Sequence, residues 1–317
     1  MSEPMAESPD IVSDLPRLPP RPPTMHKGQA GHVAIVAGSP GMTGAAVLAG
    51  LGALRAGAGL VRVLTGESVQ PIVAASEPCL MTVPLPEDAD HDLRADAFPA
   101  ADVQGWANAA AIGPGMGQKP GICGSVWAML CDTSVPLVVD ADALNVLARP
   151  DLWPPALSGD ESRWWTHCSA ERPIVMTPHP GEMARLRTAA GLDPLRGNDD
   201  QTRLRIAHEY ATLTGATVVL KGHRTVVCTR EQAFINMTGN AGMATGGMGD
   251  VLTGLIAGLL AQGLAPFDAA RLGVYVHGLA ADYCAKQIAP AGYLARDVAD
   301  ALPAALAETA RPRIGFR

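Results

Sequence analysis

The sequence has few of the features that mark membrane proteins, nucleic-acid-binding proteins or zinc proteins. Only 4% of its 317 residues are aromatic, and the formal net charge of −7 gives no general electrostatic reason to bind nucleic acid or acidic membranes. No uncharged apolar run reaches the roughly 18–20 residues that span a bilayer. The six cysteines form no CxxC pair and no His/Cys cluster with zinc spacing. Since no basic, apolar signal sequence opens the chain, we expect reduced thiols and a cytoplasmic location.

Several catalytic signatures are also missing. There is no Walker A sequence, no GxSxG elbow and no HExxH pair, which disfavours P-loop nucleotidases, serine hydrolases of that type and zinc proteases. The first glycine turn, Gly38–Gly44, reads GxxGxxG where a dinucleotide-binding Rossmann motif needs GxGxxG. An NAD-dependent dehydrogenase is therefore disfavoured, and a redox assay without ADP would test it.

What the chain does have is a repeated alternation of apolar strands and helices, with 48% hydrophobic residues. Glycine or polar turns follow successive strands, as expected for a mostly parallel α/β sheet with helices on both faces. Strands are expected at 32–37, 60–65, 109–112, 136–139, 174–177, 217–220, 226–228 and 233–236, and helices at about 45–56, 143–148, 199–214, 250–260, 266–287 and 294–307. We expect residues 1–26 to form a disordered or extended proline-rich segment, 27–310 one domain, and 311–317 a tail. Residues 150–172 resemble a surface insertion of unassigned role.

The stretch Asn240–Asp250, followed directly by an apolar helical pattern, is the strongest local signal. A glycine-rich loop that enters a helix gathers unpaired N–H groups at the positive end of the helix dipole, and it therefore predicts an anion site. Asp250 at this point either caps the helix or acts as a base toward a hydroxyl.

Three other strand ends carry polar residues whose roles stay open. Asp142 either caps the helix 143–148 or binds a metal or polar ligand, whereas Asp140 is expected to be structural. His179 and Glu182 lie in a turn, and the histidine is either structural or part of a ligand site. Lys221 is either a solvated charge or a phosphate contact. Since the carboxyl ends of parallel strands meet in one crevice, the set suits phosphoryl transfer from a nucleotide to a small-molecule hydroxyl.

With these motifs the chain resembles the ADP- or ATP-dependent NAD(P)H-hydrate dehydratases, which are nicotinamide-nucleotide repair enzymes with a ribokinase-like three-layer fold. The resemblance runs from about residue 27 to 290 and rests on six motifs in order: KGQAGHVAIVAGSPGMTGA (27–45), IGPGMG (112–117), VDADALN (139–145), TPHPGE (177–182), LKG (220–222) and NAGMATGGMGDVL (240–252).

The resemblance implies a reaction. The substrate would be the (S)-hydrate of NADH or NADPH, and transfer of phosphate from ADP, with ATP as the alternative donor, to the ring hydroxyl would make a leaving group. Loss of phosphate would then restore NAD(P)H and leave AMP. A divalent cation, usually magnesium, is expected with the nucleotide, and relatives are often homotetramers. No nucleic-acid or membrane partner is expected.

The resemblance also assigns residues. Asp250 would be the base, with Gly246–Gly249, above all Gly247 and Gly249, as the anion hole. The hydrate site would comprise Ala45, Gly115, His179 and Asp250. The nucleotide would contact Lys221, Gly222, His223, Arg224, Thr225 and Gly249. The metal ligands are not assigned, and Asp142 and Glu182 are the candidates.

Two departures from the family pattern qualify the resemblance. Position 248 is Met, where the family often has a small hydroxyl residue, which puts a side-chain contact there in doubt but leaves the backbone anion hole. Many relatives carry an epimerase domain ahead of the dehydratase, whereas only about 26 residues precede it here, so epimerase activity is not expected.

Two rival functions fit parts of the pattern. A ribokinase-like kinase of a vitamin-precursor alcohol would release a stable phosphorylated alcohol. A non-catalytic nucleotide-binding protein would lose nothing measurable when Asp250 is changed.

Overall fold

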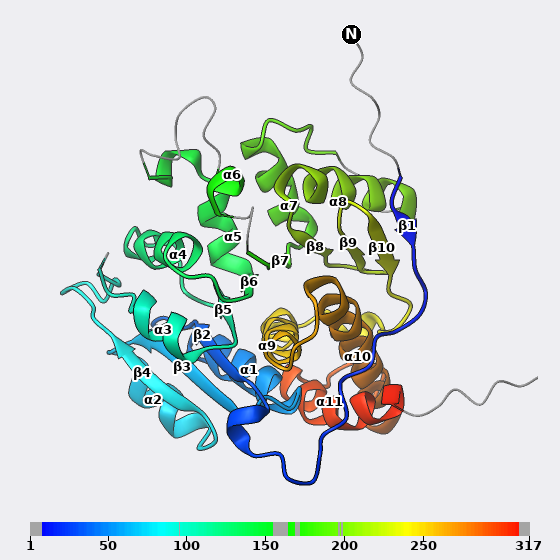
Figure 1. Ribbon diagram of the computed structural model, residues 1–317, viewed down its shortest axis with the longest axis horizontal. Helices are drawn as coiled ribbons and strands as arrows, with labels where there is room; N and C mark the ends of the chain where they lie inside the picture. The colour runs from blue at the N-terminus through cyan, green and yellow to red at the C-terminus, as the bar shows by residue number, and fades with distance from the viewer. Residues whose placement is uncertain are drawn as a thin grey trace, which may run out of the picture.

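A ten-stranded β-sheet runs through the molecule, and helices cover both of its faces (Figure 1). The computed structural model describes residues 8–94, 96–154, 164–168, 172–195, 197 and 199–310. In spatial order, the strands are β1 (Asp10–Ile11), β10 (Gln232–Ile235), β9 (Val226–Cys228), β8 (Thr217–Leu220), β7 (Ile174–Met176), β6 (Leu137–Val139), β5 (Ala109–Ile112), β2 (His32–Val36), β3 (Leu60–Gly66) and β4 (Met81–Leu85). All neighbouring pairs are parallel except the two that involve β9. The predicted mostly parallel α/β class is confirmed.

The strand order reverses between β2 and β5. From β2 the chain builds outward through β3 and β4, returns to place β5 on the other side of β2, and continues through β6, β7 and β8. Ligands of open α/β sheets bind outside the carboxyl ends of strands at such a switch point. The loops that leave β2 and β5 here are the two glycine turns of the sequence.

The sheet separates two hydrophobic cores because successive side chains of a strand point to opposite faces. In β2, Val33 and Ile35 join one core, and Ala34 and Val36 join the other. The first core is covered by α1 (Thr43–Arg55), α2 (Gln70–Ser76), α9 (Met248–Ala261), α10 (Pro266–Gln287) and α11 (Ala295–Ala310). The second is covered by α3 (Ala100–Trp106), α4 (Gly121–Cys131), α5 (Ala141–Leu147), α6 (Trp164–Cys168), α7 (Pro180–Ala189) and α8 (Asp200–Thr214).

Residues 150–172 differ from the expected surface insertion where they are described. Trp153, Trp164 and Trp165 are buried and pack in the second core, and the Trp153 indole N–H donates to the carbonyl of Leu147 at 3.2 Å. The remainder of the segment, at 155–163 and 169–171, lies outside the described residues, as does the expected tail at 311–317.

The N-terminal segment is extended over its described part, residues 8–26. β1 pairs in parallel with β10, and the chain then runs beside α10 and α11 (Figure 1). The guanidinium of Arg271 donates to the carbonyl of Asp14 at 2.8 Å, and that of Arg21 donates to Gln262 Oε1 at 2.7 Å. These bonds fix a segment that has no periodic apolar pattern of its own. Residues 1–7 lie outside the described residues.

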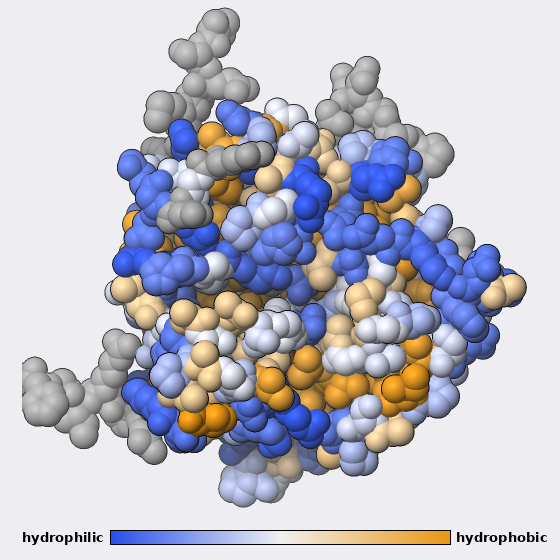
Figure 2. All heavy atoms as spheres, turned by 180° about the vertical axis from the view of Figure 1, so that it is seen from behind, coloured by the Kyte–Doolittle hydropathy of each residue, from blue (hydrophilic) through white to orange (hydrophobic). Residues whose placement is uncertain are grey.

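The surface is mixed in character. On the face drawn in Figure 2, hydrophilic residues cover most of the surface, and hydrophobic residues gather mainly in the lower half. In the described part of the chain, no helix is long and apolar enough to cross a bilayer.

Candidate functional site

The two glycine turns follow β2 and β5 at the carboxyl ends of these strands. Gly115 adopts a φ of +60°, and a Cβ added to it would lie 2.7 Å from the Cβ of Ala45 on α1. The Ser39 hydroxyl donates to the carbonyl of Gly115 at 2.9 Å, and the amide of Gly38 donates to that of Pro114 at 2.9 Å. The two turns are therefore fastened together, which places Ala45 and Gly115 side by side, as the predicted hydrate site requires.

The anion loop, Gly246–Gly249, leads into α9. Gly247 is the N-cap of this helix and adopts a φ of +89°, where a Cβ would lie 2.5 Å from Leu48 Cδ1. No side chain caps the helix. The first amide N–H groups of α9 therefore have no side-chain acceptor and lie at the positive end of the helix dipole, an arrangement that attracts phosphate.

Asp250 lies in the first turn of α9, two residues after its start, so it is not the cap residue. It is half-buried, and its carboxylate forms no hydrogen bond with another described residue. Burial, together with the nearby carboxylates of Asp140 and Asp142, raises its pKa to about 6, although the Lys221 ammonium acts in the opposite direction. A carboxylate with a raised pKa and no structural partner has the properties of a general base.

Lys221 and Asp140 form the ion pair at the centre of the site. Lys221 Nζ lies 2.7 Å from Asp140 Oδ1 and 3.9 Å from Glu182 Oε2, and the Thr253 hydroxyl donates to Asp140 Oδ2 at 2.7 Å. Burial alone would lower the pKa of Lys221, but the carboxylates of Asp140, Glu182 and Asp250 outweigh it and raise the pKa. A Cβ added to Gly249 would lie 3.4 Å from Lys221 Nζ. A protonated amine therefore lies directly beside the anion loop.

Asp142 does not cap the helix that follows β6, because that helix begins at Ala141 and its N-cap is Asp140. Asp142 Oδ2 instead accepts the amide N–H of Gly117 at 2.8 Å and so holds the glycine loop that follows β5. Burial raises the pKa of Asp142 despite this hydrogen bond.

His179 and Glu182 do not form a free turn but the start of α7. The Nδ1 atom of His179 accepts the amides of Gly181 and Glu182, while Glu182 Oε2 accepts the amide of His179 at 2.7 Å. Burial and the charges of Lys221 and Arg185 lower the pKa of His179, which suits its role as an acceptor. His179 is thus a helix cap whose ring is still half exposed.

A cavity of about 570 Å³, here called the α10 cavity, opens between the β8–β9 turn, the loop before α9, and α10. Its wall contains all six residues predicted to contact the nucleotide, Lys221, Gly222, His223, Arg224, Thr225 and Gly249, and also Met248. Asp250 directly follows Gly249 of this wall in the chain. The volume is within the range of small-ligand sites, about 300–1,000 Å³.

The α10 cavity also has walls that the motifs did not indicate. His277 of α10 is buried, and burial together with the Lys221 charge lowers its pKa to about 4, so the imidazole is neutral. Asn240 accepts the hydroxyl of Tyr293 at 2.6 Å and donates to Asp282 at 2.9 Å. Sequence reasoning missed His277, Asp282 and Tyr293, since they lie on α10 and in the loop after it, whereas Asn240 opens the last motif.

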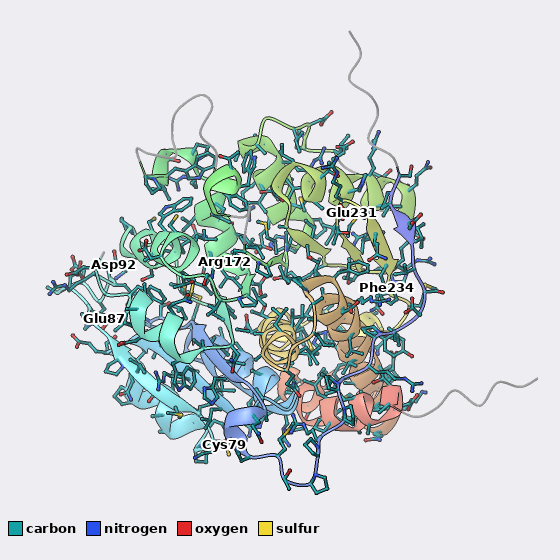
Figure 3. All side chains as sticks on the ribbon, in the orientation of Figure 1. Cys79, Glu87, Asp92, Arg172, Glu231 and Phe234 are labelled. Atoms are coloured by element: carbon teal, nitrogen blue, oxygen red, sulfur yellow. The ribbon has the colours of Figure 1, made fainter. Side chains whose placement is uncertain are left out.

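A second cavity, the α5 cavity, measures about 360 Å³ and lies on the other face of the sheet among α4, α5 and α7. It shares no wall residue with the α10 cavity. Figure 3 labels Glu87 and Asp92 in the nearby loop before α3, where Asp92 Oδ2 accepts the amide of Gly121 at the start of α4 at 2.9 Å. Most of its wall residues lie outside the motifs, so the motifs alone do not indicate this cavity.

Comparisons with known proteins agree with this geometry. The family model for NAD(P)H-hydrate dehydratase matches residues 33–304. The bifunctional NAD(P)H-hydrate repair enzyme Nnr of Moorella thermoacetica is 45% identical over 291 residues, which are 90% of this chain and 51% of that protein. The chain thus spans about half the length of the first curated relatives it matches. The ADP-dependent (S)-NAD(P)H-hydrate dehydratase of Neisseria meningitidis serogroup B is 36% identical, with 87% of this chain and 85% of that protein covered.

Solved structures give the same result. The ADP/ATP-dependent NAD(P)H-hydrate dehydratase of Bacillus subtilis, co-crystallized with ATP/Mg2+, matches with a TM-score of 0.73 and 32% identity over 92% of this chain and 95% of that one. A ribokinase-like superfamily protein of Enterococcus faecalis matches with a TM-score of 0.73 and 25% identity over 98% and 100%. The fold is ribokinase-like, and the chain belongs to the NAD(P)H-hydrate dehydratase family.

Proposed function

We propose that this protein dehydrates the (S)-hydrate of NADH or NADPH back to NAD(P)H and uses ADP as the phosphoryl donor. The observation that carries the proposal is the carboxylate of Asp250, half-buried and free of structural hydrogen bonds with other described residues, at the helix N-terminus beside Lys221. The family membership and the ADP-dependent relative from Neisseria support the choice of substrates.

The first step is phosphoryl transfer. Asp250 accepts the proton of the ring hydroxyl as that oxygen attacks the β-phosphorus of ADP, and the bond from this phosphorus to the bridging oxygen breaks to release AMP. The amides of Gly247 and Gly249 stabilise the charge on the moving phosphoryl group, since losing one such donor typically costs about 10²–10³ in rate. Lys221 neutralises phosphate charge, and Asp140 keeps its ammonium in place.

The second step is elimination. The lone pair of the ring nitrogen expels the phosphate with its bonding electrons, and the neighbouring ring carbon then loses a proton to the released phosphate, which restores the double bond. We propose that Ala45, Gly115, His179 and Asp250 surround the ring, and that Lys221–Thr225 and Gly249 hold the adenine nucleotide. The joined glycine turns and the wall of the α10 cavity support this placement.

We also propose that a divalent cation, usually magnesium, accompanies the nucleotide. Among the residues that the structure describes, no three His, Cys, Asp or Glu side chains gather to hold a metal. The absence of such a cluster among these residues fits an ion that is held chiefly by phosphates and water, with one or two carboxylates at most. Asp142 and Glu182 stay the candidates for that part, and each has one oxygen held by a backbone amide. The ion would shield the phosphates from each other.

We also propose a homo-oligomer, with a tetramer as the first candidate, a cytoplasmic location, and a domain that spans residues 27–310. Cys79, Cys123, Cys228 and Cys284 are free thiols, which suits a reducing compartment.

The test follows the return of reduced-nicotinamide absorbance from NADH hydrate with magnesium and either ADP or ATP. The wild type is expected to restore absorbance with ADP, and Asp250→Asn to lose about 10²–10⁴ of the rate, the usual contribution of a positioned base. Asp268→Asn, another acidic residue in a first helical turn, is the control and should retain the rate. No recovery with either nucleotide would refute the dehydratase function, and a stable phosphorylated alcohol as product would indicate a vitamin-precursor kinase.

A further inference from the structure

The wall of the α5 cavity contains apolar and basic side chains, although no step of the proposed reaction uses this cavity. Ile122, Val146 and Leu152 contribute apolar side chains, and Lys119, Arg149 and Arg185 contribute positive charge. Its volume of about 360 Å³ falls within the range of small-ligand sites. A flat apolar group with an attached anion would match both features.

The three positive charges in the wall of the α5 cavity are not equally available to a ligand. Arg149 forms two hydrogen bonds with the carboxylate of Asp151, at 2.9 and 2.6 Å, so its charge is balanced. Arg185 donates to the amide oxygen of Asn145 at 2.9 Å, and Lys119 donates to the backbone carbonyl of Asp90. Neither forms an ion pair with a carboxylate among the described residues. Two oriented cations without an acidic partner therefore face the cavity.

The α5 cavity is built by continuations of the segments that form the proposed hydrate site. The loop that carries Gly115 continues into Gln118 and Lys119, and the helix that His179 caps carries Arg185. Asp142 lines the cavity and at the same time accepts the amide of Gly117. The segments that surround the nicotinamide ring in the proposal thus also build this cavity, whereas the α10 cavity lies on the opposite face of the sheet.

We propose that the α5 cavity binds the adenosine half of the dinucleotide substrate, and that Arg185 and Lys119 bind the 2′-phosphate that distinguishes NADPH hydrate from NADH hydrate. This inference rests on the proposed function. A dinucleotide whose ring lies at Asp250 must place its second nucleoside along the crevice, away from the ADP that fills the α10 cavity. Arginine is suited to this task because its fork of N–H donors matches phosphate oxygens, and arginine commonly accommodates a 2′-phosphate in dinucleotide sites.

The test compares both hydrates at saturating ADP in the full-length protein. Arg185→Gln and Lys119→Gln are each expected to raise KM for NADPH hydrate about tenfold, the usual cost of one hydrogen bond to a charged group. KM for NADH hydrate, KM for ADP and both kcat values should stay within about twofold. The control is Arg296→Gln, which removes an exposed arginine of α11 that pairs with Glu77 and lines neither cavity.

An equal change of KM for both hydrates, or no change for either, would overturn the inference. A wild type that converts neither hydrate would refute the proposed function instead. A binding measurement separates the two further, because calorimetry of adenosine 2′,5′-bisphosphate with ADP-saturated protein needs no turnover. Binding to the wild type and to Arg296→Gln that weakens about tenfold in Arg185→Gln is the expected result, and equal affinity for all three proteins would contradict it.

Discussion

Lys221 Nζ lies 2.7 Å from Asp140 Oδ1, although 81 positions separate the two residues in the chain. Lys221 follows β8, and Asp140 follows β6 and precedes α5, so their ion pair joins two strand ends across the crevice. Thr253 of α9 donates to the second oxygen of the same carboxylate at 2.7 Å. One buried carboxylate therefore sets the position of the amine and of the anion loop relative to each other.

This relationship predicts a large loss of stability in Lys221→Gln. Asp140 is only 1% exposed, so removal of its cation leaves a buried charge uncompensated, which typically costs about 3–5 kcal/mol. Urea denaturation would measure the change in the free energy of unfolding. The exposed pair of Arg55 and Asp300 provides the control, since Arg55→Gln should cost less than about 1 kcal/mol. Equal losses in the two variants would contradict this account.

The pKa of Asp250 predicts how its replacement changes stability with pH. The pKa is raised to about 6 in the folded protein from 3.8, so the native state favours the protonated acid. Its stabilising effect is present below pH 4 and is lost as the pH rises through 6. Asp250→Asn should therefore match the wild type near pH 4 and exceed it at pH 8, by on the order of 1–3 kcal/mol. Thermal unfolding across this range measures the difference, and a variant less stable than wild type at pH 8 would show that the carboxylate is structural.

The same pKa predicts the pH dependence of the reaction. A general base must be ionised to accept a proton, so log kcat/KM should fall with a slope of one below about pH 6 and level off above it. Steady-state rates with NADH hydrate at saturating ADP would measure the profile. Lys221 stays protonated throughout, because its carboxylate neighbours raise its pKa. A profile that stays flat down to pH 5 would exclude Asp250 as the base.

Much of the fold could be predicted from the sequence because buried parallel strands appear as short apolar runs and glycine turns follow them. The predicted strand 109–112 and helix 266–287 have the same bounds in the structure. The helix that begins at Pro180 was not predicted, because two prolines around a histidine are typical of a turn and histidine is an unusual helix cap. The tryptophans at 153, 164 and 165 were misjudged because they lack periodicity, yet they are buried.

The candidate site likewise has parts that the sequence predicts and parts that it does not. The anion loop and the Lys221 turn are local patterns, and their neighbourhood in space follows from the carboxyl ends of parallel strands. Asp140 could not be placed beside Lys221 and Thr253 from the sequence, because nothing near it in the chain identifies these partners. His277 and Asp282 lie within the long helix α10, and no motif marks them. Pairings across such distances depend on the packing of the whole domain.

The anion loop predicts a contrast between two adjacent glycines. Gly247→Ala should destabilise the protein by more than about 1 kcal/mol, because the residue has a φ of +89° and the new Cβ would lie 2.5 Å from Leu48 Cδ1. Gly246→Ala is the matched control, since nothing lies within 4 Å of a Cβ at that position. Thermal unfolding of both variants measures the effect. Similar stability in the two proteins would mean that the loop tolerates a different backbone conformation.

The loop that lines the α10 cavity predicts a specific effect on nucleotide binding. Asp282 accepts the amide of Gly239 with Oδ2 at 3.0 Å and the side-chain amide of Asn240 with Oδ1 at 2.9 Å. Asp282→Asn has one acceptor oxygen in place of two, so one donor loses its partner and the loop loses a fixed contact. KM for ADP should rise about five- to tenfold, while kcat stays within about twofold because Asp250 and Lys221 are untouched. Asp268→Asn, an acidic residue in the first turn of the same helix that pairs with Arg271, should leave KM for ADP unchanged. A fall in kcat with unchanged KM would show instead that Asp282 supports the chemical step, and equal behaviour of both variants would show that the loop holds its position without Asp282.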